Sequence, residues 1–274
     1  MTEAQRGPWT PPEGPLGRLT ERSRGRAAAA RAEYVALERR ALDTTAAPSF
    51  VAALRRADIA IIAELKRRSP SKGVLDESLD AGARAAAYAA GGAAALSILT
   101  EPTEFGGALE DLTAARTQVQ VPLLRKDFIV DEVQLLEARV AGASAVLLIA
   151  RAHPPAAFAR LATAARALGL DVLLEVRDER ELECALAVGD GVIGINNRNL
   201  ETLAIDDSVS ERLLRLVPSD RLAVYESGVR DAAGVQRAAA LGADAVLIGS
   251  ALSVAVSAAD AVRALTGVAR GRRG

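Results

Sequence analysis

The chain has 274 residues, half of them hydrophobic, so it can bury a large core as one or two domains. Its formal net charge is -1, which predicts neither nucleic acid nor a membrane surface as a partner. A single cysteine, Cys184, excludes an intramolecular disulfide and a cysteine-cluster metal site, and we interpret the single histidine, His153, as a loop residue.

The N-terminal region has a different composition from the rest. Residues 1–15 are rich in proline, glycine and charge, which predicts a disordered tail. Neither the apolar core of a signal peptide nor an apolar run of membrane-spanning length is visible, so we expect a soluble, cytoplasmic protein. An Ala/Arg/Glu-rich segment predicts a helix over 16–42, and a short second helix is predicted over 49–56.

From residue 59 onward, short apolar runs alternate with amphipathic, alanine-rich segments. The runs are continuously hydrophobic, as expected for parallel strands covered by helices. Strands are predicted over 59–65, 94–99, 121–126, 144–149, 171–176, 191–196, 221–226 and 244–249. Helices are predicted over 81–90, 108–117, 131–141, 155–168, 179–188, 208–216 and 232–241.

About eight βα units favour an α/β fold, a closed (β/α)8 TIM barrel, and we expect one barrel domain over residues 16–270. A doubly wound open sheet is the alternative. That alternative is weaker because no Gly-x-Gly-x-x-Gly follows the first predicted strand.

Polar residues gather where the predicted strands end. Chemistry in a (β/α)8 barrel lies at the C-terminal ends of the strands, so this asymmetry predicts an enzyme. The alternative is a set of ion pairs that only hold loops in register. The polar strand ends are Glu64 and Lys66, the segment 100–107, Arg125-Lys126-Asp127, Glu175, Asn196-Asn197-Arg198, Glu226-Ser227-Gly228 and Gly249-Ser250.

Lysine is scarce and concentrated in these motifs. The chain has 34 lysines and arginines, of which only Lys66, Lys72 and Lys126 are lysines. Lysine, unlike arginine, can release a proton. Glu64 and Lys66 are two residues apart and share one face of a strand. We expect nearby cations to lower a lysine's pKa toward that of a general acid, and burial to raise a glutamate's pKa toward that of a base.

The last two strand ends predict a phosphate site. Ser227-Gly228 and Gly249-Ser250 are small and leave backbone N–H groups accessible. The segment after Ser250 can start a short helix whose N-terminus favours an anion, at the position where such barrels commonly bind phosphate.

In order and spacing, these motifs resemble those of the indole-3-glycerol-phosphate synthase family. The longest is Ile-Ala-Glu-Leu-Lys-Arg-Arg-Ser-Pro-Ser-Lys-Gly over 62–73. The others are Leu-Thr-Glu-Pro-Thr-Glu-Phe-Gly-Gly over 99–107, Leu-Arg-Lys-Asp-Phe-Ile over 124–129, Leu-Leu-Glu-Val over 173–176, Gly-Ile-Asn-Asn-Arg-Asn-Leu-Glu-Thr over 194–202, Glu-Ser-Gly-Val over 226–229 and Leu-Ile-Gly-Ser over 247–250.

The resemblance implies a barrel whose N-terminal helices, over about 16–56, form a lid at the active-site mouth. It implies a lyase that closes the ring of 1-(2-carboxyphenylamino)-1-deoxyribulose 5-phosphate, giving indole-3-glycerol phosphate, carbon dioxide and water in tryptophan biosynthesis. No metal or organic cofactor is implied.

The resemblance also implies roles for single residues. Lys126 would be the general acid at the substrate carbonyl oxygen, and Glu175 the other main acid/base group. Lys66 would contact the carboxylate that is lost, while Glu64 and Asn196 would orient these groups. The implied substrate-binding residues are Ser69, Arg198 and Glu226, with Ser227, Gly228, Gly249 and Ser250 for the phosphate and Phe105 for the anthranilate ring.

Two other functions are weighed against this one. Phosphoribosylanthranilate isomerase relies on a Cys/Asp pair, whereas Cys184 here falls in a predicted helix. A non-catalytic barrel that binds a phosphorylated ligand would be favoured by loss of Lys126 or Glu175, and both are present. The expected partner is therefore a small phosphorylated substrate, and any other tryptophan-pathway enzyme would be a separate chain.

Overall fold

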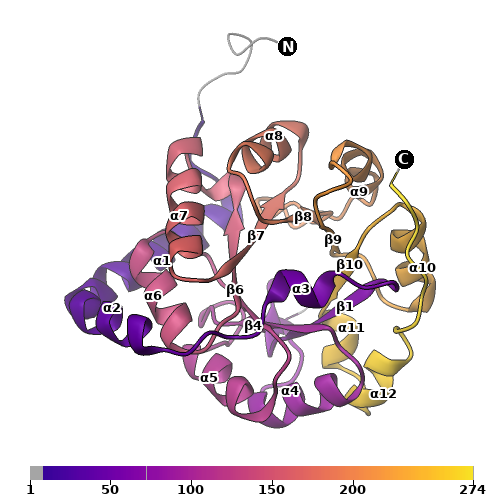
Figure 1. The fold of residues 1–274 in the computed structure, drawn as a ribbon, viewed down its shortest axis with the longest axis horizontal. Coiled ribbons are helices and arrows are strands. Elements are labelled where there is room, and N and C mark those ends of the chain that lie inside the picture. Colours follow the sequence, from indigo (N-terminus) through magenta and orange to yellow (C-terminus); the bar gives the residue numbers. More distant parts are fainter. Residues whose placement is uncertain (1–8, 72, 274) are drawn as a thin grey trace.

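Eight parallel strands close into a barrel in the computed structural model, which describes residues 9–71 and 73–273 (Figure 1). Strand β1 closes the ring because it pairs with both β4 and β10, which confirms the barrel and excludes the open sheet. The barrel strands are β1 (Ala60–Leu65), β4 (Ala95–Leu99), β5 (Leu123–Lys126), β6 (Ala145–Ile149), β7 (Asp171–Val176), β8 (Val192–Asn196), β9 (Ala223–Glu226) and β10 (Ala245–Ile248).

Helices surround the strands as the alternating pattern predicted. They are α4 (Ala81–Ala90), α5 (Leu109–Gln118), α6 (Glu132–Val140), α7 (Pro155–Ala167), α8 (Glu179–Ala187), α9 (Ser208–Leu213), α10 (Ala232–Ala240), α11 (Ser250–Ser253) and α12 (Ala258–Arg263). The sequence did not predict α12. A hairpin of β2 (Arg68–Ser69) and β3 (Gly73–Val74) lies in the loop after β1. None of the helices in the described ranges is long and apolar enough to cross a membrane.

The helix expected over 16–42 is divided in two. It forms α1 (Gly14–Ala30) and α2 (Tyr34–Asp43), joined by a 3-10 turn at Arg31–Glu33. The two helices bury apolar stripes against different parts of the barrel. In α1, Leu16 packs with the interior of the strand ring, whereas Leu37 of α2 packs against helix α6. The 3-10 turn between them separates the two packing surfaces.

Residues 1–8 of the tail that was predicted to be disordered lie outside the described residues. From Trp9 the chain has contacts with the barrel, because the Trp9 indole donates to the carbonyl of Arg151 at 3.3 Å. Helix α1 begins at Gly14, inside the range assigned to the tail.

Helices close the barrel at both ends. The short helix α3 (Phe50–Leu54) covers the N-terminal ends of the strands, where the Asp171 carboxylate at the start of β7 accepts from the backbone N–H of Val51 at 3.0 Å. Phe50 and Leu54 are fully buried there. At the opposite end, the Leu16 N–H of α1 donates to the Leu200 carbonyl in the loop after β8. Of the segment 16–56 that was expected to form a lid, α1 therefore lies at the C-terminal ends of the strands, whereas α3 lies at the opposite end and cannot belong to a lid there.

Alternate strand residues form two layers. Along β1, Ile61 and Ala63 pack outward against the helices, whereas Ala60 and Ile62 belong to the interior cluster. Glu64 is the next residue of β1 that points to the interior, two residues after Ile62. The alternation that fills the barrel therefore also places a carboxylate inside it, near the C-terminal ends of the strands.

Candidate active site

The C-terminal ends of the strands surround a cavity of about 320 Å³. This volume suits a small molecule. Every site residue predicted from the sequence lines it: Lys126, Glu175, Lys66, Glu64, Asn196, Ser69, Phe105, Arg198, Glu226, Ser227, Gly228, Gly249 and Ser250. The structure therefore brings the predicted set together, drawn from strands and loops that are far apart in sequence.

Lys126 lies among three buried carboxylates. Its Nζ is 3.8 Å from an oxygen of Glu175, 3.8 Å from one of Glu226 and 3.9 Å from one of Glu64. Each carboxylate comes from a different strand, and each residue is at most 4% exposed. A cation surrounded in this way is held in place from several sides and out of bulk water.

Burial and charge set the protonation of this cluster in opposing directions. Burial lowers the pKa of Lys126, but Glu175, Glu226 and Glu64 together raise it above its ordinary value. The expectation that cations would lower a lysine pKa is therefore wrong here. Burial raises the pKa of Glu64, but the charges of Lys66 and Lys126 together lower it by more. The pKa of Glu64 is therefore below its ordinary value. For Glu226, burial and the Glu175 charge raise the pKa more than Lys126 lowers it.

The second lysine of the site pairs with the same strand. Lys66 Nζ donates to Glu64 Oε1 at 2.5 Å, a contact that the shared strand face of the two residues allows. A glycine opposite leaves the room for this pair: a Cβ at Gly249 would lie 2.1 Å from Glu64 Oε1 and 2.7 Å from Lys66 Nζ. The Glu64–Lys66 pair therefore depends on the absence of a side chain at the end of β10.

An amide at the end of β8 organises the next part of the site. Asn196 Oδ1 accepts from the Arg198 backbone N–H and from the Ser227 hydroxyl, both at 2.9 Å. The Arg198 guanidinium donates in turn to the Leu203 carbonyl at 2.9 Å. Asn196 thus joins the ends of β8 and β9 and fixes the loop that carries Arg198.

The predicted phosphate residues form a turn with left-handed backbone. Ser227 has φ 65° and Gly228 has φ 89°, and only glycine adopts such angles without cost. Successive residues of this kind direct backbone N–H groups into a concavity that suits anions. Ser250 begins α11 beside them in the lining of the cavity. The turn and the helix start are therefore available to hold a phosphate group.

The opposite wall of the cavity is apolar. The rings of Phe105 and Phe128 lie 6.3 Å apart between centroids, tilted by 34°. Further apolar side chains come from α1, β6 and the loop after β8, namely Leu19, Leu147, Ile149 and Leu200. This wall suits an aromatic ring, whereas the charged end of the cavity suits anionic groups.

Several buried polar atoms at the cavity have no hydrogen-bond partner among the described residues. They include the Ser69 hydroxyl, Glu175 Oε2 and both carboxylate oxygens of Glu226. Buried polar atoms are normally satisfied, so these atoms are candidates for contact with a ligand.

Some residues that lie beside the predicted site residues were not predicted from the sequence. Gly194 lies beside Glu175 in the β7–β8 register, and a Cβ there would be 2.2 Å from Glu226 Oε1. A glycine inside a strand often marks such a close approach and could have revealed it. Asp127 and Glu101, both buried, were quoted within motifs but given no role. Cys184 lies in the surrounding helix α8 and does not line the cavity, so the Cys/Asp alternative has no support.

The single histidine, His153, lies away from the cavity, and the pKa of its side chain tests whether it is buried. His153 is 5% exposed and stacks on Phe158. Burial, followed by the Arg24 charge, lowers its pKa from 6.5 to about 4, although the Ile129 backbone opposes this. Because the folded-state pKa is lower than the unfolded one, the stabilisation is present above pH 6.5 and is lost as the pH falls toward 4.

We expect this loss to be about 3 kcal/mol of unfolding free energy, since one pKa unit corresponds to roughly 1.4 kcal/mol. The imidazole proton signal in an NMR titration should have a midpoint near pH 4. A midpoint at the ordinary histidine value would contradict the burial of His153.

A closed (β/α)8 barrel with lysines, carboxylates and a small-residue turn around a cavity at the C-terminal strand ends is the arrangement of a barrel enzyme acting on a small phosphorylated molecule. The family model "Indole-3-glycerol phosphate synthase" matches residues 16–265, and the chain belongs to that family.

Named relatives agree with this assignment. An indole-3-glycerol phosphate synthase from Nocardioides sp. is 52% identical over 214 residues, covering 78% of this chain and 82% of the relative. Indole-3-glycerol phosphate synthase 2 from Streptomyces coelicolor is 47% identical over 221 residues, covering 81% and 86%. A solved 3-hexulose-6-phosphate synthase from Salmonella typhimurium has a TM-score of 0.62 at 15% identity, covering 76% of this chain and 96% of its own, which shows the fold alone.

Proposed function

We propose that this protein catalyses the reaction of its family. It closes the pyrrole ring of 1-(2-carboxyphenylamino)-1-deoxyribulose 5-phosphate and releases carbon dioxide and water, giving indole-3-glycerol phosphate for tryptophan biosynthesis. The observation that carries the proposal is the position of Lys126 among three buried carboxylates, in a cavity that also has an apolar wall and the Ser227-Gly228 turn.

The charged end of the cavity supplies the proposed acid and base. The three carboxylates around Lys126 favour its charged form, and it donates its proton to the substrate carbonyl oxygen as the ring carbon attacks. Loss of carbon dioxide from the attacked ring carbon restores the benzene ring. In the dehydration that follows, Glu175, 3.8 Å from Lys126, takes the proton from the neighbouring carbon and passes it to the hydroxyl, which leaves as water. Lys66 contacts the carboxylate that is lost as carbon dioxide, and Glu64 orients Lys66 at 2.5 Å.

The remaining residues hold the substrate by its two ends. The Ser227-Gly228 turn and the Gly249-Ser250 helix start bind the phosphate, and Phe105 covers the anthranilate ring. Asn196, Arg198, Ser69 and Glu226 contact the polar groups between these ends. A cytoplasmic location, and separate chains for the other pathway enzymes, stay predictions.

Direct turnover tests the proposal. Purified protein is mixed with 1-(2-carboxyphenylamino)-1-deoxyribulose 5-phosphate, and the fluorescence of the indole product is followed over time. We expect continuous product formation that saturates with substrate. Substrate binding without any indole product would contradict catalysis and favour the non-catalytic barrel.

A further inference from the structure

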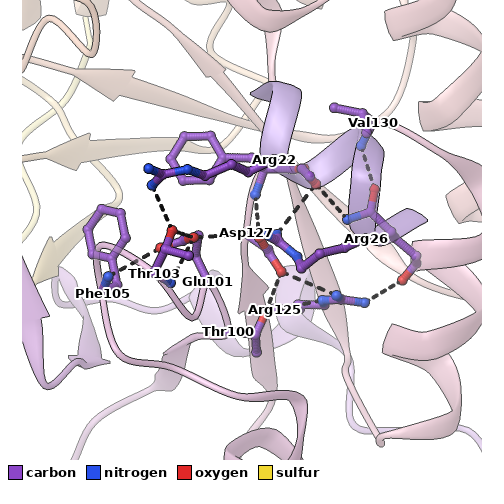
Figure 2. A network of polar contacts seen from close by, with 12 residues as sticks. Arg22, Arg26, Thr100, Glu101, Thr103, Phe105, Arg125, Asp127 and Val130 are labelled. Atoms are coloured by element: carbon purple, nitrogen blue, oxygen red, sulfur yellow. Dashed lines mark hydrogen bonds and ion pairs between the residues drawn. The ribbon is translucent and has the colours of Figure 1, made fainter. Parts of the chain in front are cut away.

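A network of polar contacts ties helix α1 to the upper end of the barrel, outside the catalytic cluster (Figure 2). At its centre, Arg26 Nη2 donates to Asp127 Oδ1 at 2.7 Å, and Arg26 Nη1 lies 3.6 Å from Glu101 Oε1. Both carboxylates are almost inaccessible, with side chains 1% and 0% exposed, whereas the Arg26 side chain is 30% exposed. One arginine from α1 thus reaches two buried carboxylates on different strand ends.

The Glu101 carboxylate shapes the loop that follows β4. It accepts from the backbone N–H groups of Thr103 at 3.0 Å, Glu104 at 2.7 Å and Phe105 at 3.2 Å. Three amide donors on one carboxylate fix the path of the backbone at each of these residues. Phe105 is therefore presented to the cavity, against Phe128, by a loop that is folded around Glu101.

The Asp127 carboxylate has the corresponding role at the end of β5. Its Oδ2 accepts from the Thr100 hydroxyl at 2.8 Å and from Arg125 at 3.2 Å, and its Oδ1 also accepts from the Phe128 N–H at 2.8 Å. These bonds fix the backbone directly after Lys126. In the part of the chain that the structure describes, Arg26 is the cation within ion-pair distance of Glu101, whereas Asp127 has Arg125 as well.

We propose that Arg26 and Glu101 are positioning residues for the reaction. Docked α1 holds the Phe105 loop and the Lys126 strand end in register through Arg26, so the aromatic-ring pocket and the catalytic lysine are set together. This inference rests on the proposed function, because it concerns the substrate ring that Phe105 covers and the lysine that reacts.

The structure also shows why an Arg26 variant should still fold. Ser23 of α1 is fully buried, donates to the Phe128 carbonyl, and accepts from the Gln134 side chain at 2.9 Å. Leu16 and Leu19 of α1 belong to the interior cluster. The Ser23 hydroxyl also accepts from Arg26 Nη2 at 3.5 Å, but its bonds to Phe128 and Gln134 and the burial of the two leucines keep α1 attached when the Arg26 guanidinium is removed.

A double-mutant cycle on KM tests the link between the two residues. We expect Arg26→Ala and Glu101→Gln each to raise KM by about tenfold, because the ring pocket loses its shape, and the double variant to raise KM no further than about tenfold. Arg24→Ala is the matched control, because the ion pair of Arg24 in the described structure is with Glu21 of its own helix and its charge otherwise acts on His153, away from the cavity; its KM should stay within about twofold of the wild type.

A role limited to stability would lower the melting temperature and leave KM unchanged in folded protein. If the wild type turns over but the KM of Arg26→Ala stays within twofold, the inference is overturned while the proposed function stands. If the two single effects multiply in the double variant, Arg26 does not act through Glu101 and the inference is equally overturned. A wild type without turnover would overturn the function and, with it, the positioning role.

Hydrogen exchange gives a readout that needs no activity. The N–H groups of Thr103, Glu104 and Phe105 are bonded to Glu101, so a peptide covering 101–107 should exchange slowly in the wild type. We expect exchange there to be about tenfold faster in Arg26→Ala and unchanged in Arg24→Ala. Equal exchange in the wild type and Arg26→Ala would overturn the link between α1 and the loop.

Discussion

Replacement of Lys126 by methionine should lower kcat by about 10²–10⁴-fold, the usual contribution of a positioned general acid. Methionine keeps the length of the side chain and removes the proton that the substrate carbonyl requires. The three carboxylates within 3.9 Å then face one another without their shared cation. The rate of indole formation at saturating substrate measures the effect.

A matched control separates the chemistry from loss of charge in general. Arg212 pairs with Glu179 on the surface, with both side chains 48% exposed, and lies outside the cavity. Arg212→Met should keep kcat within about twofold, since exposed ion pairs contribute little. Equal activity of Lys126→Met and Arg212→Met would exclude Lys126 as the general acid.

The second large effect is expected at Gly194, a residue that bears no functional group. A Cβ at this position would lie 2.2 Å from Glu226 Oε1, so alanine must displace the carboxylate whose other oxygen lies 3.8 Å from Lys126 Nζ. We expect kcat of Gly194→Ala to fall by about 10- to 100-fold, because small displacements in a catalytic cluster cost that much. Steady-state kinetics with circular dichroism as a check of folding measure it.

Two comparisons show whether the loss acts through Glu226. In a Glu226→Ala background, Gly194→Ala should have little further effect, because the displaced group is already absent. Gly25→Ala is the control for the substitution itself: it lies within α1, where an added Cβ would meet nothing within 4 Å. It should leave kcat unchanged and raise the free energy of unfolding by about 0.5–1 kcal/mol. A full effect of Gly194→Ala without the Glu226 carboxylate would contradict this explanation.

Strand periodicity made the barrel and the composition of the site predictable. Buried parallel strands are continuous apolar runs, so the polar residues that interrupt them, such as Glu64 and Glu175, stand out at their ends. Because all eight strand ends meet at one face of a barrel, position along each strand was sufficient to bring these residues together. No knowledge of side-chain packing was needed for that step.

Features that depend on packing between distant segments were not predictable in the same way. The pKa of Lys126 depends on how many carboxylates surround it, and that number comes from three separate strands. The contact of Arg26 with Glu101 and Asp127 requires the position of α1 on the barrel, which local composition does not specify. The turn that separates α1 from α2 has the same origin, since each helix follows its own packing surface.

Carbon dioxide and indole-3-glycerol phosphate should be released together by ring closure at Lys126. Substrate labelled in its carboxyl group is incubated with the wild type and with Lys126→Met, and labelled carbon dioxide and indole-3-glycerol phosphate are measured in the same samples. We expect equal amounts of the two products from the wild type and neither product above background from the variant. Carbon dioxide released without indole-3-glycerol phosphate would contradict ring closure in this cavity. Product amounts from Lys126→Met equal to those of the wild type would contradict the role of Lys126.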